Sequence, residues 1–86
     1  MLNNIKWMME LVDQEVPTGV VDGVNVTYQL SKKPHTPKSA LVMLNGNIQY
    51  NGVDWTMNTE GEILFAFPPA LGSCPYVFYL KYRSED

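Results

Sequence analysis

The side chains of this chain that could do chemistry are few and scattered. It holds one histidine, His35, and one cysteine, Cys74, and neither belongs to a recognisable motif. A catalytic nucleophile needs a base within hydrogen-bonding reach, and the spacing of the sequence provides no such pair. We expect Cys74 to be a small packed residue and His35 to be an exposed loop residue. The sequence therefore predicts no catalytic residue and no enzymatic activity.

The acidic residues give no stronger sign of chemistry. Glu60 and Glu62 flank a glycine in a predicted turn, which is typical of solvated acids. Asp54 beside Trp55 could form a sugar site, but we favour a turn cap for Asp54 and a core position for Trp55. A lone cysteine rules out a cysteine-based metal site, and no phosphate loop or dinucleotide fingerprint is present. We expect no cofactor and no bound metal.

Length and charge narrow the possible classes of protein. Eighty-six residues predict one domain, and a chain of this size buries only a modest core. Because a single cysteine cannot form an internal disulfide, self-association is the remaining common route to extra burial. The net charge of −3 argues against nucleic acid as the main ligand. With no secretory signal and no apolar run of membrane-spanning length, synthesis in a reducing cytosol without membrane insertion is expected.

Residues 2–16 carry an apolar stripe at spacings of three and four, which predicts an amphipathic helix that ends at Pro17. Trp7 projects near the polar side of this helix, where an exposed indole is uncommon. The helix could pack on its own sheet, or it could pair with copies of itself or with a host protein. The width of the apolar arc favours the second alternative. The predicted assembly interface is Leu2, Ile5, Trp7, Met9, Val12 and Val16.

From Val20 onwards apolar residues tend to recur at every second position, which predicts short strands. Asn45-Gly46 is a strong signal for a two-residue hairpin, and Pro68-Pro69 favours a crossing between sheets over a tight hairpin. The continuous apolar run 40–44 is typical of a central strand. The predicted strands are 24–30, 40–44, 47–50, 53–57, 62–67 and 76–82.

These elements predict a mainly β fold, in which an N-terminal α-helix precedes a small antiparallel β-sandwich of about six short strands. The domain limits follow from the change of period. Residues 1–16 form the anchoring or multimerisation helix, and residues 17–86 form the β-sandwich domain.

Four motifs, in order, carry a resemblance to a known family. They are D-G-x-N-x-T-Y-x-L-S from Asp22, L-N-G-x-x-Q from Leu44, G-V-D-W-T from Gly52 and F-P-P from Phe67. As a set they resemble a small β module of tailed-bacteriophage virion proteins, such as tail fibres, head fibres and capsid decoration proteins. The resemblance covers about residues 20–82. The chain departs from the family pattern with tryptophan in place of tyrosine in the third motif and with phenylalanine in place of alanine in the fourth.

The resemblance implies a non-enzymatic virion structural protein, either a capsid decoration (cement) protein or a component of a short fibre. Such a protein would be made in the host cytoplasm, assemble on the particle through its helix and display the β domain. The implied partners are copies of itself, with a homotrimer favoured by family analogy, and other virion proteins of the capsid or tail. Neither nucleic acid nor membrane is an expected partner.

An alternative is a carbohydrate-binding adhesion module that attaches the particle to a host surface glycan. Its candidate stacking rings are Tyr50, Trp55 and Tyr79. This alternative requires at least one aromatic ring exposed in a groove beside polar groups. A third alternative is a small interaction domain of a cellular protein complex.

Overall fold

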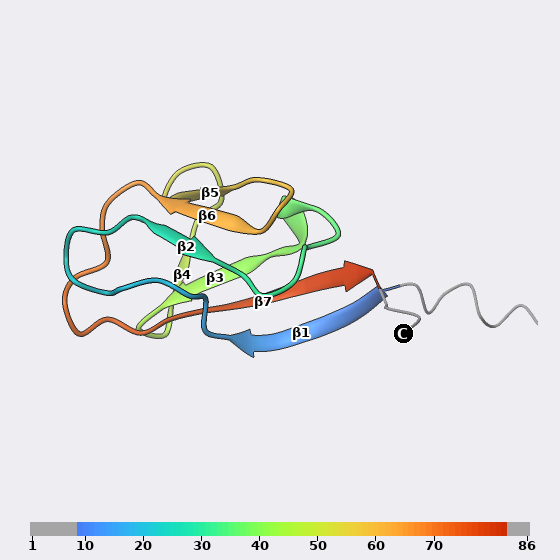
Figure 1. Cartoon of the computed structure of the whole chain (residues 1–86), viewed down its shortest axis with the longest axis horizontal. Helices are drawn as coiled ribbons and strands as arrows, with labels where there is room; N and C mark the ends of the chain where they lie inside the picture. The colour runs from blue at the N-terminus through green and yellow to red at the C-terminus, as the bar shows by residue number, and fades with distance from the viewer. Residues whose placement is uncertain (1–8, 83–86) are drawn as a thin grey trace, which may run out of the picture.

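The computed structural model describes residues 9–82 and is mainly β (Figure 1). Within that range there are seven strands and one short 3-10 turn at Pro37–Ser39. The strands form two antiparallel sheets. The four-stranded sheet has the order β1 (Met9–Glu15), β7 (Pro75–Tyr82), β3 (Leu41–Leu44), β4 (Asn47–Gln49). The three-stranded sheet has the order β2 (Thr27–Gln29), β6 (Glu62–Phe65), β5 (Trp55–Met57).

The two sheets face each other across one hydrophobic core, and Figure 1 shows them as two layers. Successive side chains of a strand point to opposite faces, so each strand gives every second residue to the core. Tyr28 and Phe65 meet there edge to face, with ring centroids 5.5 Å apart. Trp55 links the layers because its indole nitrogen donates to the carbonyl oxygen of Gln49, at 3.0 Å. The buried core consists of Tyr28, Leu30, Val42, Trp55, Ile63, Phe65, Val77 and Tyr79.

The predicted N-terminal helix is wrong over residues 9–15, which form strand β1. This strand pairs antiparallel with β7, with Leu11 opposite Leu80 and Val12 opposite Tyr79. A helix of about 15 residues is marginal by itself, whereas the edge of β7 offers this segment a ladder of backbone hydrogen bonds. Long-range pairing therefore prevails over the helical spacing. Residues 2–8 of the predicted helix lie outside the described residues.

The C-terminal end of β1 is held by the side chain of Glu15. The strand is bulged between Val12 and Glu15, and Gln14 has a positive φ of 53°. One carboxylate oxygen of Glu15 accepts from the hydroxyl of Tyr79 at 2.5 Å, and the other accepts from the backbone N–H of Ser31 at 2.6 Å. This carboxylate therefore ties the edge strand both to the core and to the loop after β2.

The predicted Asn45-Gly46 hairpin is confirmed. Both residues have positive φ, 54° and 83°, as a type I′ turn requires, and β3 pairs with β4 directly across this turn. The predicted crossing at Pro68-Pro69 is also confirmed, because this segment connects β6 in the three-stranded sheet to β7 in the four-stranded sheet.

Two glycines with nearly the same backbone conformation should differ in their tolerance of a methyl group. Gly46 has φ +83° and open space around the Cβ position, whereas a Cβ on Gly61, with φ +85°, would lie 3.0 Å from the carbonyl oxygen of Lys32. We expect Gly46→Ala to lower the free energy of unfolding by about 1 kcal/mol, the cost of the left-handed conformation. Gly61→Ala should lower it further because of the added clash. Urea unfolding measures both, and equal losses would contradict this account.

The buried hydroxyl of Tyr79 should make the fold sensitive to alkali. Burial and the hydrogen bond to Glu15 raise the pKa of Tyr79 from 10.0 to about 12. A raised pKa means that the folded state favours the protonated phenol, so this stability is present below pH 10 and is lost as the pH rises towards 12. We expect Tyr79→Phe to show a smaller loss of melting temperature than the parent protein over this window. If the melting temperature of Tyr79→Phe falls as much as that of the parent protein between pH 10 and 12, the loss does not come from the Tyr79 hydroxyl.

Candidate functional site

The two residues best suited to nucleophilic chemistry lie at opposite ends of strand β7. The backbone N–H of His35 donates to the carbonyl oxygen of Leu80 at 2.6 Å, whereas Cys74 comes directly before Pro75, the first residue of β7. About six residues of extended chain separate these positions, or roughly 20 Å, so the two cannot form a nucleophile–base pair. Cys74 is exposed and His35 is half-buried, so the expected packed thiol and exposed imidazole are both wrong.

Asp54, Glu60 and Glu62 lie in or next to turns that side-chain hydrogen bonds stabilise. The carboxylate of Asp54 accepts from the backbone N–H of Tyr50 at 2.8 Å, which confirms the predicted turn cap. The Asn58 side chain accepts from the backbone N–H groups of Glu60 and Glu62, at 3.0 and 2.9 Å. Among residues 9–82, no cluster of histidine, cysteine and acidic residues could hold a metal ion. Over the same range, no helix has the length and apolar character needed to cross a membrane.

The predicted glycan-stacking rings are separated by the fold. Trp55 and Tyr79 are only 2% and 0% exposed and belong to the core, so a sugar cannot stack on either ring. This burial confirms the core position favoured for Trp55 and removes both residues from the candidate stacking rings. Tyr50 is 68% exposed and follows β4 at the edge of the four-stranded sheet.

The predicted assembly residues do not share one face in the described part of the chain. Val12 is half-buried and packs against the core, whereas Val16 follows β1 and is 70% exposed. Met9 begins β1, where its backbone pairs with Tyr82. Leu2, Ile5 and Trp7 lie outside the described residues.

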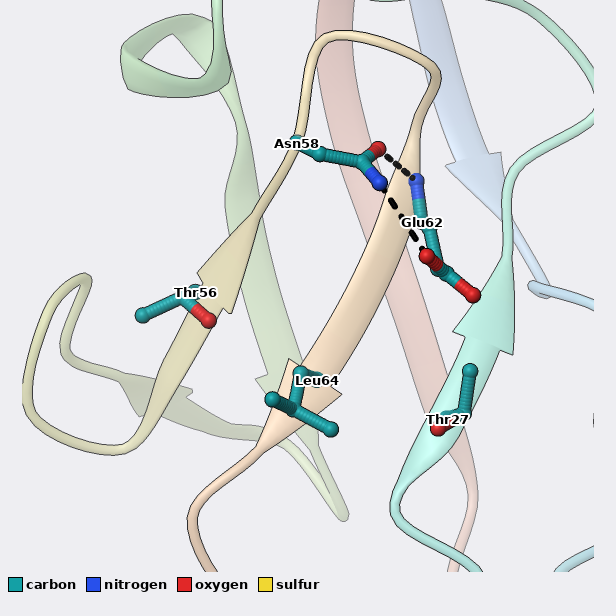
Figure 2. A pocket seen from close by; sticks show the side chains of 5 residues that line it. All are labelled: Thr27, Thr56, Asn58, Glu62 and Leu64. Atoms are coloured by element: carbon teal, nitrogen blue, oxygen red, sulfur yellow. Dashed lines mark hydrogen bonds between the residues drawn. The ribbon is translucent and has the colours of Figure 1, made fainter.

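The outer face of the three-stranded sheet bears a shallow depression of about 210 Å³. Figure 2 shows Leu64 in its centre, with Thr56 on one neighbouring strand and Thr27 on the other. At its upper end, the Asn58 side chain donates to the Glu62 carboxylate at 3.1 Å. The Asn58 and Glu62 side chains thus already bond to each other, and the depression combines polar side chains at its edges with the exposed apolar Leu64 at its centre.

The outer face of the four-stranded sheet is different because it is apolar across all four strands. Val77 and Tyr79 of β7 point into the core, so Tyr76, Phe78 and Leu80 point to the opposite side. Directly paired residues share a face, and the register places Leu11 opposite Leu80, Leu41 opposite Phe78, and Met43 opposite both Tyr76 and Ile48. We call this surface the apolar face. Its members are Leu11, Leu41, Met43, Ile48, Tyr76, Phe78 and Leu80.

The apolar face is substantially open to solvent. Leu11 is 59% exposed, Ile48 is 55% exposed and Leu41 is 41% exposed. Between them, the rings of Tyr76 and Phe78 pack edge to face with centroids 6.0 Å apart. None of the seven residues is charged. An apolar surface that spans four strands is a candidate site of interaction with another molecule.

The sequence contains a signal for this surface, which is missed if strands are recognised only by alternation of apolar and polar residues. Residues 40–44 and 76–80 are continuous apolar runs, and such runs are typical of strands covered on both faces. The run 40–44 predicts a central strand correctly, because β3 lies between β7 and β4. The same run also indicates that the outer face of this strand is apolar.

Comparisons with known proteins identify no relative. No family model, no curated protein and no solved structure matches the chain. The function must therefore be argued from the residues of this chain, and the surface best suited to a function is the apolar face.

Proposed function

We propose that the protein is a non-enzymatic structural component of a tailed-bacteriophage particle, either a capsid decoration protein or part of a short fibre. The observation that carries this proposal is the apolar face. Seven side chains without charge share one face of the four-stranded sheet, and they provide a contact surface of the kind that a protein needs if it acts by holding other proteins in place. In this role the apolar face takes the place of the predicted anchoring helix.

The motifs that resemble the virion module support a scaffold role. The carboxylate of Asp22 accepts from the backbone N–H groups of Val24 and Asn25, at 2.9 and 2.8 Å. These bonds stabilise the carboxylate and lower the pKa of Asp22 below its usual value. The carboxamide of Asn45 accepts from the backbone N–H of Cys74 at 2.8 Å, which joins the β3–β4 hairpin to the start of β7. Both motif residues therefore hold loops in place.

Glycan binding is the weaker alternative. Of its three candidate rings, only Tyr50 is exposed, and a sugar site needs a ring together with convergent polar groups in a groove. The Asp54 carboxylate near Tyr50 already accepts from that residue's backbone N–H. A structural role requires no such groove and agrees better with the described residues.

Analysis of purified particles tests the proposal. We expect mass spectrometry of particles produced by the source organism, purified on a density gradient, to find peptides of this chain at a fixed ratio to the major capsid protein. Leu41→Lys, on the apolar face, should abolish incorporation because it buries a charge in the contact. Leu64→Lys is the matched control, because Leu64 has similar exposure, 50% against 41%, on the other sheet.

Two results would contradict the virion role. One is the absence of the chain from particles while its gene is expressed. The other is equal incorporation of Leu41→Lys and Leu64→Lys, which would show that the apolar face takes no part in attachment. Circular dichroism of both variants confirms that each remains folded.

A further inference from the structure

We propose that β1 is a detachable edge strand, which opens from β7 as one unit while the rest of the sandwich stays folded. The carboxylate of Glu15 is the group that holds the strand closed, and the hinge lies between Gln14 and Thr18. This device does not depend on the virion role, because it follows from contacts within the chain.

The buried core is complete without β1. All of its buried residues lie outside this strand, in the range from Tyr28 to Tyr79. Among residues 10–15 only Val12 packs against the core, and Val12 is itself half-buried. Because burial of apolar surface is the main force that holds a domain together, the loss of β1 removes little of that force. The other strands can therefore stay folded when β1 leaves.

Strand β7 has a second set of bonds that holds it in place when β1 leaves. From Pro75 to Phe78 it pairs with β3, and Figure 1 shows β1 on its other side, at the edge of the sheet. Further along β7, the carbonyl oxygen of Leu80 accepts from the backbone N–H of His35 at 2.6 Å. The backbone N–H of Leu80 donates to the hydroxyl of Ser39 at 3.3 Å. These partners belong to the body of the sandwich, so β7 does not need β1 to keep its position.

Polar contacts hold the inner side of β1 at both of its ends. Glu10 forms an ion pair with Lys81 at 3.1 Å. The carboxylate of Glu15 accepts from the hydroxyl of Tyr79 at 2.5 Å and from the backbone N–H of Ser31 at 2.6 Å. Bonds of this kind are strong only at short distance and good angle. A small displacement of β1 therefore breaks them together, which favours two distinct positions of the strand.

The hinge lies where the backbone is already distorted. The strand is bulged between Val12 and Glu15, and Gln14 has a φ of 53°, in the left-handed region that residues other than glycine rarely adopt. Opening lets Gln14 return to an extended conformation and relieves this strain. Beyond the hinge, Thr18 is fixed to β2 because its backbone N–H and carbonyl oxygen both bond to Gln29, at 2.8 and 2.9 Å.

Opening would change the surface used in the proposed function. It removes Leu11 from the apolar face, and it turns β7 from an inner strand into an edge strand. An edge strand presents unpaired backbone N–H and carbonyl groups, which can pair with another chain. The closed and open forms therefore offer different surfaces, and a partner that binds one form better than the other would shift the balance between them.

Native-state hydrogen exchange of the full chain, recorded by NMR at increasing urea concentration, tests the inference. We expect the amides of Glu10 and Val12 to exchange through one shared opening, at least about tenfold faster than the amide of Val42 in β3. Their exchange rates should depend weakly on urea, because the opening of one strand exposes little surface.

Two patterns of exchange in the parent protein would overturn the proposal. If Glu10 and Val12 exchange at the rate of Val42 and with the same dependence on urea, β1 opens only when the whole domain unfolds. If Glu10 exchanges much faster than Val12, with a different dependence on urea, the strand frays from its end and does not open as a unit.

A substitution in the body of the sandwich separates the two kinds of opening. Ile63 is fully buried on β6, so Ile63→Val should speed exchange at Val42 about two- to tenfold by weakening the whole domain. The exchange rates of Glu10 and Val12 should stay unchanged, because Ile63 remains packed when β1 opens. Equal acceleration at all three amides would contradict a separate opening of β1.

Two acid-to-alanine variants of the same strand test the role of Glu15. Glu15→Ala removes both hydrogen bonds and should speed exchange at Glu10 and Val12 at least about tenfold. Asp13→Ala removes the same charge from an exposed position of the strand and should leave these rates unchanged. Equal effects of the two variants would show that Glu15 does not hold the strand closed.

Discussion

The alternation of side chains along strand β7 is the constraint on which the rest of the structure depends. This strand pairs with β1 on one side and β3 on the other, so its register fixes which residues of three strands share a face. Val77 and Tyr79 point inward and define one wall of the core. The same geometry forces Phe78 and Leu80 outward, although both are apolar. The register of β7 with its two neighbours therefore determines both the core and the apolar face.

The sequence predicts much of this fold because local signals agree with it. The Asn45-Gly46 turn, the crossing at Pro68-Pro69 and the burial of Trp55 all follow from the chemistry of single residues or pairs of residues. Strand β1 could not be predicted in this way. The apolar spacing over residues 2–16 suits a helix. Residues 9–15 are instead extended because their backbone pairs with the edge of β7, more than sixty positions away in the sequence. Such long-range pairing leaves little trace in local periodicity.

The candidate site was predictable only in part, for a related reason. The run 40–44 indicates a strand covered on both sides, but the sequence does not show which strands lie beside it. The register brings Leu11 from one end of the chain and Ile48 from its middle onto the same face as Phe78. A search for reactive side chains also directs attention to Cys74 and His35, which the fold holds at opposite ends of β7.

The central claim is that the apolar face is covered by protein in the working state. The most direct measurement is hydroxyl-radical footprinting with mass-spectrometric readout, on the free protein and on the protein in purified particles. The account predicts that Leu11, Leu41 and Ile48 become protected in the particles, while Leu64 stays accessible. Equal labelling of all four residues in both states would contradict it.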